Sequence, residues 1–208
     1  MVELQGVKNL IFDFGGVILD IDFGLTAKAF ERLGVSNTES LIKRAMHLDF
    51  FGQFERGKIS PYEFRSEMCD LADKQLSHQE FDDAWNEMLL DIPEERVRIL
   101  ENLRKKYRLF LLSNTNKIHY ANYYNRVQHL GYPFVDDLFE KAWFSFNIGL
   151  AKPGREIFDY IIKEKSLNPS ECLFVDDMPE NIAGAELAGI KGLCIQPGTF
   201  AEYFRTKE

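Results

Sequence analysis

Asp13, Ser113-Asn114 and Asp176-Asp177 each come directly after a short apolar run. Runs of this length without polar alternation suit the central strands of a parallel sheet that is covered on both faces. Because parallel strands end at the same edge, we expect the three polar groups to meet there, where ligands of open α/β sheets bind. One aspartate after a strand is more often a helix cap or a turn residue, but three such strand ends favour a functional site.

Several carboxylates at one edge would repel one another, and their pKa values would rise unless a cation neutralised them. Asp13, Asp176 and Asp177 supply the hard oxygen ligands that suit Mg²⁺. The sequence has no histidine or cysteine cluster of the kind that binds zinc or copper. We therefore predict a magnesium site.

Lys152 offers the opposite charge, in a segment where we expect Pro153 to open a helix. The helix dipole disfavours a cation at that end, so a lysine there makes more sense if an anion binds beside it. A lone lysine is usually a solvated surface residue. The neighbouring motifs favour a functional role for Lys152.

Two other groups of residues could suggest a site, and we interpret both as structural. The acids of the second Val-Asp-Asp, at 135–137, suit the start of a short helix, and no convincing strand precedes them. The four histidines show no metal or nucleophile-base spacing, so we predict surface or capping positions for them. They are His47, His78, His119 and His129.

The apolar runs and the helical patterns between them predict an α/β fold with a doubly wound parallel sheet. The expected strands are 9–12, 109–112, 172–175 and 193–195, with a weaker one at 142–145.

Residues 21–91 contain no strand-like run and repeat the punctuation of helices instead. Capping boxes are predicted to start at Ser36, Ser60 and Ser77, with Pro61 at the favoured first helical position. We therefore predict an all-helical insertion directly after the first strand. The expected domains are an α/β core, 1–20 and 92–208, and a helical cap, 21–91.

The composition limits the partners. Among 208 residues, Lys and Arg total 25 and Asp and Glu total 33, which gives a net charge of −8. That balance argues against nucleic acids or anionic membranes as partners. The sequence shows neither a leader pattern nor an apolar run long enough to span a bilayer, so we predict a cytoplasmic protein. The oligomeric state stays open.

In order and spacing these motifs resemble those of the haloacid dehalogenase superfamily of aspartyl phosphotransferases. Asp13 lies in a match to its first motif, Ser113 to its second, Lys152 to its third and Asp176-Asp177 to its fourth. The resemblance covers nearly the whole chain and is strongest to bacterial sugar-phosphate phosphatases of the glucose 1-phosphate type. It implies a Rossmann-like core with a helical cap and hydrolysis of a small-molecule phosphate ester.

The resemblance also implies the roles of the first and fourth motifs. Asp13 would attack phosphorus and form an aspartyl-phosphate that water then hydrolyses. Magnesium would bind the Asp13 carboxylate, the main-chain carbonyl of Gly15, and Asp176 and Asp177, and would neutralise charge beside the phosphate.

The other two motifs would bind and stabilise the phosphoryl group. The resemblance implies that Ser113 and the neighbouring Asn114 hydrogen-bond the phosphoryl oxygens. Lys152 would contact the substrate as well and would act catalytically, because its ammonium offsets the charge of the nucleophile and the transferring group.

One position departs from the pattern of the superfamily. Most of its phosphatases carry a second aspartate two residues after the nucleophile, as general acid and base, and here that residue is Gly15. Either water or another carboxylate, such as Asp20 or Asp22, takes the role, or the protein is a slow or inactive relative.

Two further alternatives for the function stay open. One is a 2-haloacid dehalogenase, in which Asp13 attacks carbon without a metal, and the other is a non-catalytic binding protein.

The aromatic-rich stretch 49–57 lies in the predicted cap. The plainer interpretation is packing between cap helices. The alternative is that some of Phe51, Glu55 and Arg56 face the cleft and select the substrate.

Overall fold

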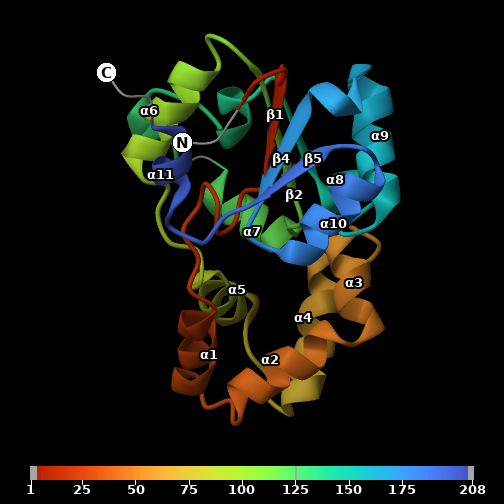
Figure 1. Cartoon of the computed structure of the whole chain (residues 1–208). Coiled ribbons are helices and arrows are strands. Elements are labelled where there is room, and N and C mark those ends of the chain that lie inside the picture. Colours follow the sequence, from red (N-terminus) through yellow and green to blue (C-terminus); the bar gives the residue numbers. More distant parts are fainter. Residues whose placement is uncertain (1–3, 125, 206–208) are drawn as a thin grey trace.

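The computed structural model describes residues 4–124 and 126–205, and it places a five-stranded parallel sheet inside the larger of two lobes (Figure 1). The strand order is β3-β2-β1-β4-β5, so the first strand lies in the middle and the chain crosses over to both sides of it. This confirms the predicted doubly wound fold, including the weaker strand near residue 142. The strands are β1 (Asn9–Phe12), β2 (Arg108–Ser113), β3 (Lys141–Phe144), β4 (Cys172–Asp176) and β5 (Lys191–Cys194).

Helices cover both faces of the sheet. They are α6 (Glu94–Leu103), α7 (Lys117–Tyr123), α8 (Ser145–Ile148), α9 (Arg155–Lys165), α10 (Pro179–Leu187) and α11 (Phe200–Phe204), with 3-10 turns η1 (Gln128–Leu130), η2 (Val135–Leu138) and η3 (Pro169–Glu171). Leu10 and Phe12 pack in a cluster with α6 and α11, whereas Ile11 packs with α9 and α10. Successive β1 residues therefore face different apolar layers, which explains why this strand lacks polar alternation.

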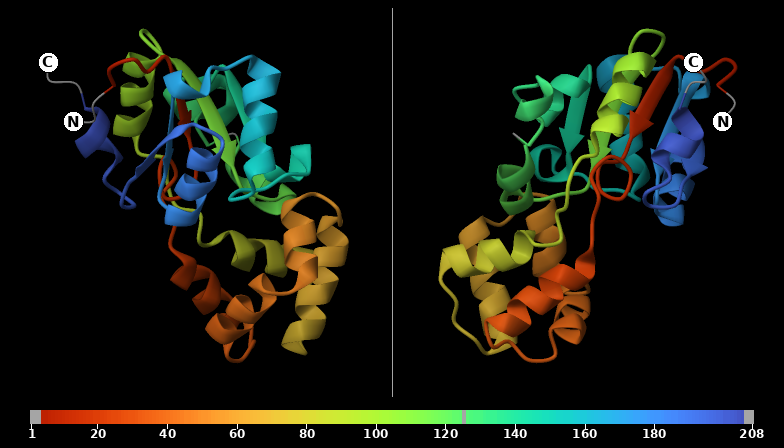
Figure 2. Two further views of the ribbon diagram at one scale, coloured as in Figure 1. Left: turned by 45° about the vertical axis from the view of Figure 1, so that its right-hand side comes forward. Right: turned by 90° about the vertical axis from the view of Figure 1, so that its left-hand side faces the viewer.

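The segment between β1 and α6 is helical and forms the second lobe, beyond the carboxyl edge of the sheet (Figure 2). Its helices are α1 (Phe23–Arg32), α2 (Thr38–Met46), α3 (Asp49–Glu55), α4 (Pro61–Ala72) and α5 (His78–Asn86). They enclose a core of their own around Phe64, Phe81 and Trp85. Two connections join the lobes, and they pair where Ile21 bridges Leu89 in antiparallel fashion. The domain limits at 20/21 and 91/92 stay predictions.

Two local expectations are wrong, although Ser60 and Ser77 both form the predicted capping boxes. Helix α2 has Asn37, not Ser36, as its N-cap, and Asn37 has a left-handed φ of 53° and makes no side-chain cap. Helix α9 begins at Arg155 after the N-cap Gly154, so Pro153 precedes the helix instead of opening it.

Within the described residues no helix is both long and apolar enough to cross a bilayer.

Candidate active site

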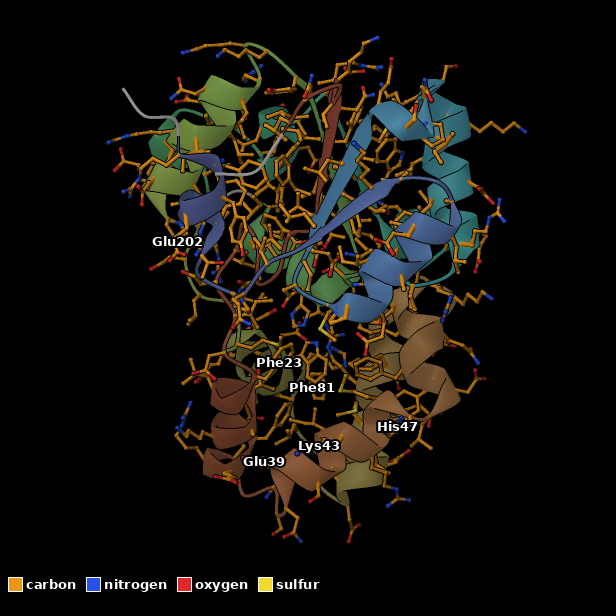
Figure 3. All side chains as sticks on the ribbon, viewed as in Figure 1. Phe23, Glu39, Lys43, His47, Phe81 and Glu202 are labelled. Carbon is orange, nitrogen blue, oxygen red and sulfur yellow. The ribbon has the colours of Figure 1, made fainter. Side chains whose placement is uncertain are left out.

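A cavity of about 610 Å³ lies between the carboxyl edge of the sheet and the cap. Asp13, Gly15, Ser113, Asn114, Lys152 and Asp177 all line it, so the three predicted strand ends do converge. The cap contributes a mostly apolar wall, and Figure 3 shows Phe23 at the end of the cap that faces the core. The apolar residues of this wall are Ile21, Phe23, Ile42, Met46, Phe51, Trp85, Met88 and Leu89.

Lys152 lies between two carboxylates. Its Nζ is 2.8 Å from Asp13 Oδ1 and 2.6 Å from Asp176 Oδ2, and the lysine side chain is 1% exposed. Burial alone would lower the pKa of this ammonium, but the attraction of Asp13 and Asp176 outweighs it and holds the pKa above its ordinary value. The lysine therefore carries its charge at neutral pH. This ion pairing explains the position of Lys152, which the argument from a helix dipole does not.

The carboxylates themselves have unfavourable surroundings. Burial raises the pKa of Asp13 to about 7, against the attraction of Lys152 and with the repulsion of Asp176. Burial also raises the pKa of Asp177, and Asp176 adds to that effect. Oxygen atoms of Asp13, Asp176 and Asp177 lie within 4.8 Å of one another. A hard divalent cation fits this donor set, because it would relieve the repulsion and keep the acids ionised.

Asp176 is held by a network that we did not anticipate from the sequence. The main-chain N–H of Met178 donates to its Oδ1 at 2.8 Å, and Asn181 Nδ2 donates to both carboxylate oxygens, at 3.0 and 3.1 Å. With Lys152 included, this fully buried carboxylate accepts bonds from three residues. The sequence offers one signal for the bond between Asn181 and Asp176, which is an amide side chain in the first turn of the helix that follows the acidic pair.

Gly16 allows the acidic pair to approach the loop after β1. Its φ is +76°, and a Cβ at this position would lie 2.5 Å from Asp177 Oδ2. A side chain here would therefore push Asp177 away from the cavity.

The loop after β2 is fixed by two side chains, Asn116 of the loop itself and Ser145 of α8. Ser113 ends the strand, is buried and lines the cavity. The Thr115 N–H donates to Ser145 Oγ at 3.0 Å, and Ser145 Oγ donates back to the Thr115 carbonyl at 2.9 Å. Asn116 caps α7 by accepting from the N–H groups of Ile118 and His119. These bonds fix the main chain that follows Ser113.

The side chain of Asn114 bonds the main chain of Lys152. Its side-chain amide bonds both the N–H and the carbonyl of Lys152, each at 2.9 Å. The side chain is thus occupied in positioning Lys152. The contact of Asn114 with the substrate stays a prediction, and its main-chain N–H is the group left to make it.

Asp20 and Asp22, the two proposed substitutes for the missing acid, are engaged elsewhere. Asp20 Oδ1 pairs with Arg96 at 2.7 Å, and Arg96 also donates to the Ile18 carbonyl. Asp22 caps α1 by accepting from the Gly24 N–H at 2.9 Å. Neither residue lines the cavity, so the structure argues against both.

His119 is not the surface residue that we predicted. It is buried, it lines the cavity, and its ring stacks on Trp85 at 5.4 Å with an interplanar angle of 2°. Its Nδ1 lies 2.9 Å from Asn86 Oδ1, and burial lowers its pKa to about 3. The ring is therefore neutral at physiological pH. His47, His78 and His129 are exposed, as predicted.

Part of the aromatic stretch packs inside the cap, and part of it lines the cavity. Phe54 is buried in the cap core and stacks on Phe64 with ring centroids 4.0 Å apart. Phe51 and Glu55 line the cavity, whereas the Arg56 side chain bonds back to the Gly52 carbonyl.

Comparisons with known proteins agree with this geometry. The chain is 37% identical over 183 residues to the D-ribitol-5-phosphate phosphatase of Bacteroides thetaiotaomicron, a match that covers 87% of this chain and 88% of the relative. It is 27% identical over 192 residues to a sesquiterpene phosphatase of Aspergillus oryzae, covering 89% and 88% of the two chains.

Two solved structures are similar to this one over most of the chain. A magnesium complex of a haloacid dehalogenase family enzyme from Bacteroides thetaiotaomicron has a TM-score of 0.88 and 34% identity, covering 97% of this chain and all of that one. A mutant of that enzyme, in complex with magnesium and inorganic phosphate, has a TM-score of 0.86 with 34% identity, and the match covers 92% of this chain and 95% of that one. The family model for haloacid dehalogenase-like hydrolases matches residues 7–189 of this chain. The chain belongs to the haloacid dehalogenase-like hydrolase family.

Proposed function

We propose that this chain is a Mg²⁺-dependent phosphatase that hydrolyses the phosphate ester of a small metabolite, a sugar or sugar-alcohol phosphate, through an aspartyl-phosphate. The observation that carries the proposal is the Lys152 ammonium, buried between Asp13 and Asp176 at the wall of a capped cavity. The phosphatase relative, which by its name acts on D-ribitol 5-phosphate, supports the substrate class.

In this proposal Asp13 attacks phosphorus and the ester oxygen leaves as an alcohol. The Ser113 hydroxyl and nearby main-chain N–H groups bind the phosphoryl oxygens. Lys152 stabilises the negative charge that nucleophile and phosphate bring together. Water then attacks the phosphorus and releases inorganic phosphate and Asp13.

Asp13, the main-chain carbonyl of Gly15, Asp176 and Asp177 would hold the Mg²⁺. When bound, the ion neutralises the charge of the phosphate and of these carboxylates. A magnesium complex of a relative at 34% identity supports this cofactor. The apolar cap wall would exclude bulk water during phosphoryl transfer. Cytoplasmic location and the absence of nucleic-acid or membrane partners stay predictions.

Hydrolysis of D-ribitol 5-phosphate and p-nitrophenyl phosphate, with Mg²⁺ and with EDTA, tests the proposal. We expect turnover of both esters that EDTA abolishes. Release of halide from a 2-haloacid without Mg²⁺ would show carbon chemistry at Asp13 instead. Binding of inorganic phosphate without turnover of any ester would show a non-catalytic protein.

A further inference from the structure

We propose that Glu55 of the cap is the general acid and base of this reaction, in the role that Gly15 leaves empty. The inference rests on the proposed phosphatase function and names the residue that moves the proton. It assigns the role to a residue of α3, a helix that is far in sequence from the other site residues.

Glu55 is the carboxyl group that the cap contributes to the cavity. Four acids line this cavity: Asp13, Glu55, Asp177 and Glu180. Asp13 and Asp177 belong to the charge cluster around Lys152, and Glu180 is exposed on α10. Glu55 is half-buried at the end of α3, and within 4–124 and 126–205 no residue hydrogen-bonds or pairs with its carboxylate. Its proton is therefore not committed to any described partner.

The position of Glu55 suits the leaving group. Phosphoryl transfer proceeds roughly in line, so the leaving oxygen lies on the side of phosphorus opposite the nucleophile. Asp13 follows β1 in the core, and the open space of the cavity lies on the cap side. The ester oxygen and its organic group must therefore extend toward the cap. A carboxyl group on the cap wall is on the side where protonation is needed.

The surroundings of Glu55 favour its protonated form. Burial raises the pKa of this carboxyl group, while the positive charges of Arg56 and Lys152 act in the opposite direction without cancelling the effect. A raised pKa brings a glutamate closer to the operating pH, where a general acid works best.

A close contact between cap and core fixes the end of α3. Gly57 has a φ of +65°, and a Cβ there would lie 2.1 Å from the carbonyl oxygen of Phe146 in α8. Only a glycine allows this approach. Because Gly57 is two residues from Glu55, the contact holds the Glu55 backbone against the core.

The proton balance of the two half-reactions is complete. As the Asp13–phosphorus bond forms and the phosphorus–ester oxygen bond breaks, protonated Glu55 gives its proton to the leaving oxygen, and the alcohol departs. The Glu55 carboxylate then takes a proton from the water whose oxygen attacks phosphorus. The bond from phosphorus to Asp13 breaks, which restores both carboxyl groups to their starting states.

The leaving group provides the test. Ribitol leaves as a strongly basic alkoxide that needs a proton, whereas p-nitrophenolate leaves without one. We expect Glu55→Gln to lower kcat/KM for D-ribitol 5-phosphate by about 10²–10⁴-fold and for p-nitrophenyl phosphate by less than about 10-fold. The parameter kcat/KM is the informative one, because it reports the steps up to the release of the alcohol. Glu39→Gln is the matched control, since Glu39 is exposed on α2 and lies away from the core-facing end of the cap (Figure 3).

Three outcomes would overturn the assignment. An equal loss with both esters would show a role that does not depend on the leaving group. A higher KM with unchanged kcat would show uniform substrate binding. A wild-type enzyme that hydrolyses neither ester would remove the proposed function together with this inference, whereas the first two results would leave that function standing. If Glu55→Gln does not fold, Glu55→Asp keeps a carboxyl group and must show the same dependence on leaving group, in weaker form.

Discussion

The side-chain amide of Asn114 bonds both main-chain polar groups of Lys152. Asn114 Nδ2 donates to the Lys152 carbonyl and Asn114 Oδ1 accepts from the Lys152 N–H, each at 2.9 Å. The loop after β2 is thereby tied to the segment before α9. The backbone from which the Lys152 ammonium reaches Asp13 is fixed by this pair of bonds.

We predict that Asn114→Ala lowers kcat by about 10²-fold, because small misplacements of a positioned group have effects of this size. The free energy of unfolding should fall by about 1–3 kcal/mol, since two buried main-chain groups lose their partner. Steady-state kinetics and urea unfolding measure the two effects. Asn102→Ala, at an exposed position on α6, serves as the control. Unchanged kcat in a folded Asn114→Ala protein would contradict the positioning role.

Asp13→Asn should abolish turnover of both esters and leave the fold intact. The substitution removes the nucleophile with little change in volume, and Lys152 keeps its ion pair with Asp176. Phosphate release and circular dichroism measure activity and folding. Asp159→Asn, on the exposed side of α9, should keep full activity. Hydrolysis that persists in Asp13→Asn would refute the assignment of the nucleophile.

The sheet and the core half of the site were predictable because geometry forces them. Residues 10–12 are apolar without alternation because both faces of β1 are covered. Parallel strands end at one edge, which brings Asp13, Ser113 and Asp176 together wherever the connections run. The pattern thus predicts a shared edge for the polar strand ends, whereas the order of the strands, β3-β2-β1-β4-β5, comes from the structure.

The cap half of the site was not predictable in the same way. Helical periodicity gave the cap helices but not which faces meet the core. That orientation depends on the contact of Gly57 with Phe146 and on the bridge of Ile21 with Leu89. The sequence therefore left Glu55 as one of several options and placed His119 on the surface.

Gly15→Asp tests whether the missing acid can be restored from the core side. A Cβ at Gly15 would lie 2.5 Å from Ile21 Cδ1, so the aspartate needs this side chain to move. We expect Gly15→Asp alone to lower the free energy of unfolding by less than about 1.5 kcal/mol, because Cδ1 is the end of a half-buried side chain that can turn aside, and Ile21→Ala to remove the clash.

The effect of Gly15→Asp on catalysis is measured in the Glu55→Gln background. There, Gly15→Asp with Ile21→Ala should raise kcat/KM for D-ribitol 5-phosphate and leave that for p-nitrophenyl phosphate nearly unchanged. Ile21→Ala in the same background is the control. An unchanged rate on the poor leaving group would show that an acid at position 15 does not reach the ester oxygen.

His119 should make the stability of the protein depend on pH in the mildly acidic range. Burial holds its folded pKa at about 3, below the unfolded value of 6.5, so the unfolded chain binds the proton more readily. The neutral ring thus contributes stability that is present above pH 6.5 and is lost as the pH falls toward 3. Between pH 7 and pH 5 the loss is about 2 kcal/mol.

Urea unfolding of the wild type and of His119→Gln at both pH values isolates this contribution, because the other titrating groups are common to both proteins. The unfolding free energy of the wild type minus that of His119→Gln should be smaller at pH 5 than at pH 7 by about 2 kcal/mol. His47→Gln, at an exposed position, should show the same pH dependence as the wild type. Parallel pH dependence of wild type and His119→Gln would mean that the buried ring accepts its proton as easily in the folded as in the unfolded chain.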